Sequence, residues 1–458
     1  MQSLFGEVHC LKRLRRISSV KIVALGFALL ILTGALLLTA PFASASGESA
    51  SFVNALFTST SAVCVTGLSV LNTGTYWSAF GKVIILILIQ VGGLGFMTVA
   101  ALVSFAFRRK ISLKERIIMA DALNRDELSG VVRLMHSVIL LTFLFEGIGA
   151  LVLCVRFVPE FGFADGVAKG IFHSISAFCN AGFDIFGGSG KLNSLAQYVS
   201  DPVVNITLML LVTAGGLGFF VWTDIATRYQ RRKLHTQTKI VLLASTILIL
   251  GGALLIYAFE YKNPETLGNM SASDKIMASL FQSVTCRTAG FETISQDAFT
   301  TSSKFLSMLL MFIGGSPGST AGGIKTVTAA VLVLSAMSVI RGNDNTYVFK
   351  RRIKTTVIKK SFAVVMLSFG ALFLAVLTIC SIESMSFEKI LFEVVSAFAT
   401  VGLSCGITAD LSEISKIIII FLMYFGRIGI LTIGMAVVQR SDKSSSLYKY
   451  SDAHISVG

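Results

Sequence analysis

Four stretches of the sequence share a serine or threonine near the start and a glycine near the end. They are SAVCVTGL at 61–68, SAFCNAGF at 176–183, TCRTAGF at 285–291 and SAFATVGL at 396–403. Their glycines are separated by 115, 108 and 112 residues. Glycine adopts backbone angles that other residues avoid, so four such turns around one axis could aim their carbonyls at a dehydrated cation. The pattern predicts cation coordination by main-chain oxygen.

We therefore predict a selectivity filter, in which backbone carbonyls replace the hydration shell of a potassium ion. One copy of the motif would indicate a small-residue packing loop, but four copies at near-equal spacing favour the filter. Threonine and asparagine side chains are expected at its inner end, and no organic cofactor is predicted. The filter residues are Val65, Thr66 and Gly67; Asn180, Ala181 and Gly182; Thr288, Ala289 and Gly290; and Thr400, Val401 and Gly402.

A short run of about ten residues, opening with phenylalanine, precedes each glycine. Since a helix needs about 20 residues to cross a membrane, each run is predicted to be a re-entrant half-helix. Its C-terminal end carries partial negative charge and would favour a cation at the axis. The phenylalanines are Phe57, Phe172, Phe281 and Phe392.

The elements that must position these loops are membrane helices. Hydrophobic residues make up 54% of the chain, charged residues only 14%, and the mean hydropathy is +0.78. Since soluble domains carry about 25% charged residues, soluble enzymes, disordered regulators and disulfide scaffolds are excluded. The apolar runs are too long for barrel strands. They predict an all-α polytopic membrane protein with eight transmembrane helices, at about 22–41, 79–107, 134–158, 203–226, 239–259, 304–340, 361–382 and 414–438.

Lysine and arginine collect in alternate connecting segments. Residues 108–133 and 341–360 hold seven each, and the two ends of the chain and 228–239 are also basic. Cytoplasmic segments attract basic residues, so both termini are predicted to be cytoplasmic in a multi-pass plasma-membrane protein. The net charge of +14 then indicates contact with anionic lipids rather than nucleic acid. Ala43-Ser44-Ala45 resembles a signal-peptidase site, but the preceding apolar run is too long for a signal peptide.

Helix, half-helix, glycine loop and helix form one unit that recurs four times. The result is a pseudo-symmetric bundle around a central pore. Its predicted parts are a cytoplasmic arm at 1–21, repeats at 22–107, 134–226, 239–340 and 361–438, a cytoplasmic linker at 108–133 and a cytoplasmic tail at 439–458.

The sixth apolar run is abnormal. A continuous helix over 304–340 would be about 55 Å long, well beyond the membrane core. Within it, five glycines and a proline disfavour helix, so we predict a loop beneath the filter that acts as a gate. A passive kink is the alternative. The predicted gate residues are Gly314, Gly315, Ser316, Pro317, Gly318, Ser319, Thr320, Ala321, Gly322, Gly323, Lys325 and Arg427.

Other polar residues stand within apolar runs. A short glycine motif, which we call the glycine mark, recurs as VGGLGF at 91–96 and AGGLGF at 214–219, and its expected role there is helix packing. In the fourth repeat Arg427 replaces the second glycine of this mark. An arginine at that depth should face a cavity or a partner, here the 314–323 loop, unless it is only structurally paired. Lys325 is expected to anchor the loop towards the cytoplasm. Glu146 is predicted to bond a neighbouring helix, and Arg287 to brace the third filter loop from behind.

RTAGF at 287–291 and GGSPGSTAGGIK at 314–325 are specific marks. Through them the chain resembles, over about 15–440, the KtrB-type ion-translocating subunits of the Trk/Ktr/HKT superfamily of potassium transporters. The resemblance implies a potassium pathway in each subunit, a homodimer and a cytosolic nucleotide-binding ring, KtrA-like, that regulates it. Serine at the first filter glycine goes with sodium preference in plant members, so Gly67 favours potassium.

Three alternatives stay open. One is a sodium-conducting or sodium-coupled transporter of the same superfamily, with sodium as a coupling or activating ion. A second is an organic-solute carrier, although carriers usually show two-fold rather than four-fold repetition. A third is an intramembrane enzyme, which needs a nucleophile and a base at a shared depth. The five histidines do not pair with a serine or aspartate motif inside a predicted span.

Overall fold

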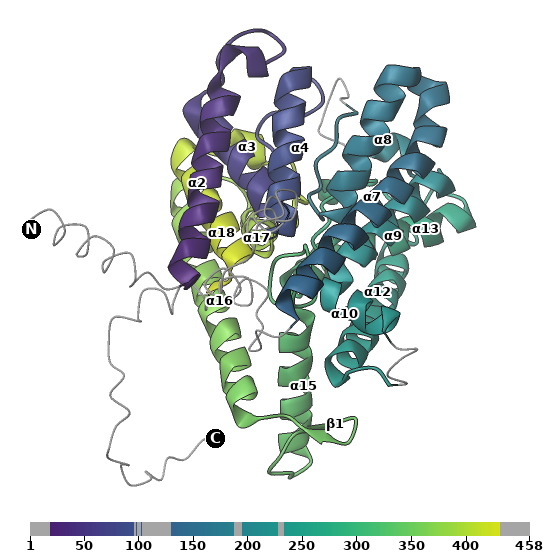
Figure 1. Ribbon diagram of the computed structural model, residues 1–458, viewed down its shortest axis with the longest axis vertical. Helices are drawn as coiled ribbons and strands as arrows, with labels where there is room; N and C mark the ends of the chain where they lie inside the picture. The colour runs from purple at the N-terminus through teal and green to yellow at the C-terminus, as the bar shows by residue number, and fades with distance from the viewer. Residues whose placement is uncertain are drawn as a thin grey trace, which may run out of the picture.

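A computed structural model describes residues 19–95, 98, 102, 130–186, 195–227 and 233–430. Helices dominate these residues and pack side by side along one direction (Figure 1). The predicted tail at 439–458 and most of the predicted arm and linker lie outside the described residues. We call the end of the bundle predicted to be extracellular the outer end, and the opposite end the inner end.

Four helices among the described residues are long and apolar enough to cross a membrane. Their outward faces carry large apolar side chains, such as Leu151 and Phe373, which are 70% and 67% exposed. An exposed apolar face of this extent suits contact with lipid rather than water. The helices are α2 (Ser19–Thr39), α7 (Val131–Phe161), α12 (Thr236–Glu260) and α16 (Thr355–Ile382).

A shorter helix follows each long one and packs against it. In three repeats a serine of the short helix donates a hydrogen bond to a carbonyl of the long helix: Ser59 to Ile31 (2.7 Å), Ser174 to Glu146 (2.6 Å) and Ser283 to Ile249 (2.7 Å). Glycines at the same level of the long helices allow this close approach. The short helices, of 13 to 16 residues, are α3 (Phe52–Cys64), α8 (Phe163–Phe178), α13 (Ala272–Thr285) and α17 (Phe387–Ala399).

The second long run of each repeat is broken, whereas the sequence predicted a break only in the sixth apolar run. Gly95, Gly218 and Gly429 end their helices with φ of 79°, 88° and 92°. Positive φ lies outside the right-handed helical region, so a helix stops there. After Gly218 the chain restarts as α10 (Phe219–Ala226), bent by 92°. The interrupted helices are α4 (Ala79–Leu94), α9 (Pro202–Leu217), α14 (Thr301–Phe312) and α18 (Glu413–Ile428).

Residues 313–325, between α14 and α15 (Thr326–Ile340), form no helix, and a parallel bridge pairs Ile313 with Ile324. The predicted sixth span is thus two short helices around a loop. α15 leads into an antiparallel hairpin, β1 (Tyr347–Val348) and β2 (Arg351–Arg352), whose turn residues Phe349 and Lys350 have positive φ. The hairpin projects at the inner end (Figure 1). Four 3-10 turns complete the described elements: η1 (Pro41–Ala43), η2 (Ala196–Tyr198), η3 (Gln296–Ala298) and η4 (Thr408–Asp410).

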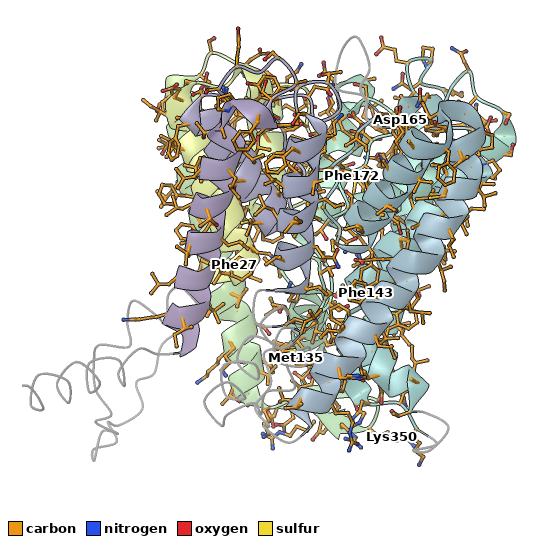
Figure 2. All side chains as sticks on the ribbon, turned by 45° about the horizontal axis from the view of Figure 1, so that its top comes forward. Phe27, Met135, Phe143, Asp165, Phe172 and Lys350 are labelled. Carbon is orange, nitrogen blue, oxygen red and sulfur yellow. The ribbon has the colours of Figure 1, made fainter. Side chains whose placement is uncertain are left out.

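Many of the fully buried apolar side chains lie on the short helices. The phenylalanines that open the predicted half-helices, Phe57, Phe172, Phe281 and Phe392, are at most 3% exposed. Figure 2 contrasts Phe172, inside the bundle, with Phe143, which is 56% exposed on α7, and shows Lys350 at the inner end. The core therefore surrounds the loops that follow the short helices and fixes their position.

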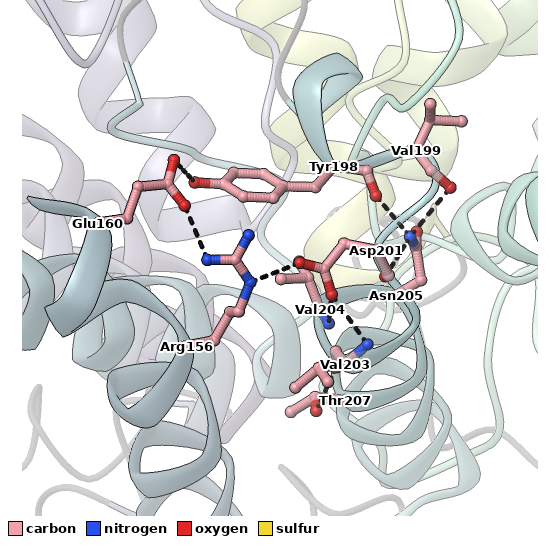
Figure 3. Close-up of polar contacts among 9 residues, drawn as sticks. All are labelled: Arg156, Glu160, Tyr198, Val199, Asp201, Val203, Val204, Asn205 and Thr207. Carbon is pink, nitrogen blue, oxygen red and sulfur yellow. Dashed lines mark hydrogen bonds and ion pairs between the residues drawn. The ribbon is translucent and has the colours of Figure 1, made fainter.

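A polar network joins α7 to α9 at the outer end (Figure 3). Arg156 pairs with Glu160 at 2.8 Å and with Asp201 at 2.6 Å, while the Tyr198 hydroxyl donates to Glu160 at 3.0 Å. Burial raises the pKa of that hydroxyl, and its bond to Glu160 raises it further. Asp201 also accepts from the backbone nitrogen of Val203 and so caps α9.

Candidate functional site

The four glycines of the repeated motif lie in contact as a closed ring. A Cβ added at Gly67 would stand 2.6 Å from the carbonyl oxygen of Ala181, and one at Gly182 would stand 2.7 Å from that of Ala289. A Cβ at Gly290 would clash with the carbonyl oxygen of Val401, and one at Gly402 with that of Thr66. Each glycine thus faces the next segment in chain order, and the fourth faces the first. We call Gly67, Gly182, Gly290 and Gly402 the glycine ring.

Backbone conformation repeats along the four segments. The first residue of each triplet, Val65, Asn180, Thr288 or Thr400, has a φ between 52° and 74°. Each ring glycine also has positive φ, between 67° and 94°. Left-handed backbone at a β-branched residue such as Val65, Thr288 or Thr400 is strained and persists only where the surroundings enforce it. The same strained turn therefore recurs at the end of all four short helices.

The serine or threonine that opens each motif holds this turn in place. The carbonyl of Ser61 accepts from the nitrogen of Thr66 at 2.8 Å, and that of Ser396 accepts from Val401 at 2.9 Å. Their hydroxyls also accept from the nitrogens of the ring glycines Gly67 and Gly402, both at 3.1 Å. In the other two segments Ser176 and Thr285 instead donate to the carbonyls of Phe183 and Phe291, at 2.8 and 2.7 Å. Their backbone carbonyls accept from Ala181 and Ala289.

Several buried side-chain oxygens in the segments lack a hydrogen-bond partner. They are Oγ1 of Thr66, Thr288 and Thr400 and Oδ1 of Asn180. A buried polar atom without a partner is costly, so an oxygen in this position suits an ion or a water. One such oxygen comes from each of the four segments. Together with the carbonyls at the ring they offer neutral oxygen ligands, which suit a hard, weakly held cation such as potassium.

Glycines of the second helices lie against the ends of the short helices. A Cβ at Gly92, Gly215 or Gly426 would clash with a carbonyl of Val63, Phe178 or Phe398, respectively. Each of these carbonyls belongs to the residue two positions before the start of a triplet. The second helices therefore support the first, second and fourth segments from below. Packing, as expected for Gly92 and Gly215 from their glycine marks, also accounts for Gly426.

The 314–323 loop lies directly beside three of the segments. Thr320 Oγ1 accepts from Asn180 Nδ2 at 3.1 Å. A Cβ at Gly314 would stand 3.2 Å from the methyl of Thr288, and one at Gly322 would clash with Thr400. The loop thus contacts the first residue of the second, third and fourth triplets. Its position is beneath the glycine ring, on the side away from the outer end.

Arg427 joins this loop to the first repeat. Its guanidinium donates to the carbonyl of Thr320 and also to those of Gly92 (2.5 Å) and Gly93 (2.9 Å). Hydrogen bonds from a charged donor contribute about 1.5–3 kcal/mol each. The arginine therefore faces the loop and fixes it to the broken end of α4.

Two other cations contact the loop. Lys325 Nζ donates to the carbonyl of Ala321 at 2.7 Å, so the lysine, which was predicted to anchor the loop, bonds directly to it. Arg287 reaches the carbonyls of Gly314 and Ser245 at 3.4 and 3.5 Å. It lies behind the third segment, where the sequence predicted a brace.

A cavity of about 780 Å³ opens on the inner side of the loop. Its wall includes Pro317, Lys325 and Arg427 near the loop and Arg351 and Arg352 of the hairpin. Residues of the loop and Arg427 line this cavity, and no residue of the four triplets does. In the part of the chain that the structure describes, no group of three His, Cys, Asp or Glu side chains could hold a metal ion.

Sequence reasoning missed two features of the site. The last glycine of three marks, Gly95, Gly218 or Gly429, ends its helix, and its constant spacing of three residues from the first glycine of the mark was the available signal. The surroundings of Cys179, just before the second triplet, were also missed. Its thiol contacts Gln90 and Glu146, at 3.7 and 3.8 Å. The predicted hydrogen bond of Glu146 to a neighbouring helix is confirmed, because Gln90 of α4 donates to it at 3.1 Å.

Long apolar helices around a ring of buried backbone oxygen define a membrane protein of the cation-transporter class. Residues 16–447 match the TrkH family of cation transport proteins, and the chain belongs to that family. It is 40% identical to the potassium/sodium uptake protein NtpJ of Enterococcus hirae, over 98% of this chain and 99% of that protein. It is 39% identical to the Ktr system potassium uptake protein B of Bacillus subtilis, over 97% of each chain.

The fold is likewise that of a solved relative. The potassium transporter TrkH from Vibrio parahaemolyticus superposes with a TM-score of 0.71, covering 92% of this chain and 84% of that one at 17% identity. The chain is thus a helical membrane protein of a potassium and sodium uptake family.

Proposed function

We propose that this protein takes up potassium ions across the plasma membrane through a filter made by the four triplets 65–67, 180–182, 288–290 and 400–402. The closed glycine ring carries the proposal, because every ring glycine abuts a carbonyl of the next segment. The C-terminal ends of the four short helices lie at the same place and contribute partial negative charge. The partnerless oxygens of Thr66, Asn180, Thr288 and Thr400 supply further ligands.

The 314–323 loop is the gate in this proposal. Its contacts with Asn180, Thr288 and Thr400 support a closed state in which the loop blocks the inner end of the filter. Arg427 adds a fixed positive charge at the same level, which repels a cation. Opening requires that the loop leave Arg427 and move into the cavity of about 780 Å³ below it.

The proposed topology keeps the four repeats. Each would contain one long helix, one short helix, one filter segment and one broken helix, and would cross the membrane twice. The similar contacts of Ser59, Ser174 and Ser283 with their long helices support this repetition. The chain would then have eight crossings, with both termini in the cytoplasm and the repeat boundaries given above.

Sodium transport is the second candidate. A relative 40% identical to this chain is named for both potassium and sodium uptake. Gly67 argues against sodium as the preferred ion. In the superfamily that the chain resembles, serine at this position goes with sodium preference.

Uptake of rubidium, a potassium analogue, into proteoliposomes containing the purified chain tests the function. We expect rubidium uptake that potassium inhibits strongly and sodium weakly. Equal inhibition by the two ions would favour the sodium candidate. Lack of any cation flux in well-folded protein, with and without cytosolic extract, would contradict the proposal.

We also propose a homodimer that binds a cytosolic nucleotide-binding subunit at its inner end. Two relatives are named as parts of a Ktr system, which supports a multi-component transporter. Arg351, Arg352 and Lys354 are exposed on and beside the projecting hairpin and offer a basic surface. Anionic lipid is the other candidate for that surface.

Charge reversal separates these two binding partners. Changing Arg351, Arg352 and Lys354 to glutamate should reduce co-purification of the cytosolic subunit, while Lys262→Glu, an exposed lysine at the outer end, should not. Unaltered co-purification together with weaker binding to anionic vesicles would leave the lipid role alone.

A further inference from the structure

Glu146 occupies a position that membrane helices rarely give to a carboxylate. It lies in the middle of α7 and is only 5% exposed. A carboxyl group in such surroundings is costly and usually serves a function. The proposed uptake mechanism does not use it, since Glu146 neither lines the cavity beneath the loop nor belongs to a filter segment.

The carboxyl lies where three elements meet. Gln90 of α4 donates to Oε2 at 3.1 Å, and the thiol of Cys179 lies 3.8 Å from Oε1. The same thiol lies 3.7 Å from Oε1 of Gln90, so the three side chains form a closed triangle. Cys179 directly precedes Asn180, which has a φ of 59°. The triangle therefore lies beside the first residue of the second filter segment, which has left-handed backbone.

The triangle is also connected to the gate through the backbone of α4. A Cβ at Gly93 would stand 2.6 Å from the sulfur of Cys179, so the two are in tight contact. The carbonyl of the same glycine accepts from Arg427 at 2.9 Å. Gly93 thus contacts Cys179, beside the second filter segment, and its carbonyl is held by Arg427, which also fixes the loop.

The positions equivalent to Cys179 differ among the repeats. Arg287, before the third segment, reaches the carbonyls of Gly314 and Ser245. Cys64 and Ala399, before the first and fourth segments, are buried, and no hydrogen bond joins their side chains to another described residue. The second segment is thus supported from behind by a carboxyl group and the third by a guanidinium.

We propose that Glu146, acting through Gln90 and Cys179, is a positioning residue that holds the second filter segment and so tunes ion selectivity. The inference rests on the proposed function. It goes beyond a helix–helix contact because the carboxyl reaches both a neighbouring repeat and the residue next to the filter. Loss of the carboxyl would let Cys179 and Asn180 shift, and the carbonyl of Ala181 with them.

The test compares sodium and rubidium uptake by variants in proteoliposomes. Glu146→Ala should raise the sodium-to-rubidium uptake ratio about two- to tenfold, the range that corresponds to one hydrogen bond. Glu146→Gln retains the shape: its amide oxygen can accept from Gln90 and its amide nitrogen can donate to the sulfur of Cys179, so its ratio should stay within about twofold of the wild type. This rescue by the conservative variant would not follow from a requirement for charge alone.

A matched control is available in Glu260. It is a fully buried carboxylate at the end of α12, but its partners are Thr300, Thr266 and Asn263, none of which belongs to a filter segment or directly precedes one. Glu260→Ala should lower thermal stability and leave the uptake ratio unchanged. An equal change of ratio in both alanine variants would overturn the inference, since the effect would then be general loosening.

Two further results decide the remaining cases. If Glu146→Ala does not fold, Gln90→Leu leaves the carboxyl in place and should raise the ratio in the same direction. A wild-type ratio in whichever of these two variants folds would overturn the positioning role. If the wild type itself shows no preference between the ions, the proposed function fails first, and the two failures remain distinguishable.

Discussion

The filter segments and the 314–323 loop lie against each other but are held differently. Each segment is fastened by its own repeat, for example Thr66 by the carbonyl of Ser61 and Val401 by that of Ser396. The loop has local contacts, such as that of Lys325 with Ala321, but other repeats hold it as well: its nitrogens at Ser316 and Thr320 donate to the carbonyls of Gly216 and Gly215, and its carbonyl at Thr320 accepts from Arg427.

In the proposed transporter, this difference separates a fixed element, the filter segments, from a movable one, the 314–323 loop. A bond within one short helix and its turn is kept whenever that helix forms. Bonds between repeats are lost together when the helices that carry them move. A Cβ at Gly318 would meet no atom within 4 Å, so the tip of the loop also has room that the ring glycines lack. We infer that conformational change resides in the loop and selectivity in the segments.

The largest effect is expected at the ring. Gly290→Ser places a Cβ against the carbonyl oxygen of Val401, at a backbone φ of 77° that serine adopts only with strain. The preference for rubidium over sodium should fall by about tenfold or more, as carbonyl placement is lost. Competitive uptake measures this preference.

Gly251→Ala is the control for the ring variant. Gly251 lies in α12, and its added Cβ would meet no atom within 4 Å. It should retain wild-type selectivity. Retained selectivity in a well-folded Gly290→Ser protein would contradict the filter.

Removing Arg427 should change rate rather than selectivity. Arg427→Ala deletes the bond to Thr320 and those to Gly92 and Gly93, so the closed state loses charge-assisted contacts of about 1.5–3 kcal/mol each. Loss of one such contact corresponds to about 10–100-fold more open protein. Initial rubidium uptake should rise and depend less on a cytosolic partner.

Deletion of 316–320 should act in the same direction, because it shortens the plug itself. Wild-type uptake with intact regulation in both well-folded variants would show that the loop is a passive kink.

A smaller effect is expected from the local brace of one segment. Ser396→Ala removes the hydroxyl that accepts from the nitrogen of Gly402 at 3.1 Å, but the backbone brace to Val401 remains. One hydrogen bond contributes about 0.5–1.5 kcal/mol, so selectivity should fall by about two- to tenfold without a change in gating. Ser381→Ala, an exposed serine on α16, is the control. A change of uptake rate alone would contradict local fastening of the segments.

The smallest effect should come from the outer polar network. Asp201→Asn retains the cap on α9 but loses the charge opposite Arg156, whose side chain is 37% exposed. Partly exposed ion pairs contribute about 0–1 kcal/mol, so the thermal midpoint should fall by only a few degrees at most. Selectivity and rate should both stay at wild-type values, since the network contacts neither the filter nor the loop. A shift in selectivity would show that this network also holds the filter segments in place, contrary to the account.

The sequence predicts what depends on local pattern. The four serine-to-glycine motifs are readable because each brace and its turn lie within about six residues, as in Ser61 to Gly67. Glycines and a proline within 314–323 indicate a loop for the same reason. The level of Arg427 also follows from counting, because it stands as far beyond its ring glycine as Gly315 does beyond Gly290.

The remaining features depend on contacts between repeats. The helix ends at Gly95, Gly218 and Gly429 lie in runs apolar enough to be helix throughout, so hydropathy does not reveal them, and at Gly218 packing against the loop stabilises the break. A hydrogen bond at Gly218 illustrates this, since Phe219 just after it donates to the carbonyl of Gly318. The turn of Lys325 onto Ala321 could not be predicted either, because both that loop carbonyl and the cytoplasm satisfy a lysine.

The central claim is that the four segments bind the transported ion with backbone carbonyls. Anomalous diffraction from crystals grown in rubidium tests it most directly. We predict rubidium peaks on the axis of the glycine ring, between the carbonyl oxygens of Thr66, Ala181, Ala289 and Val401, and their loss in the Gly290→Ser variant. Rubidium peaks only outside the ring, in protein that still takes up rubidium, would contradict the account.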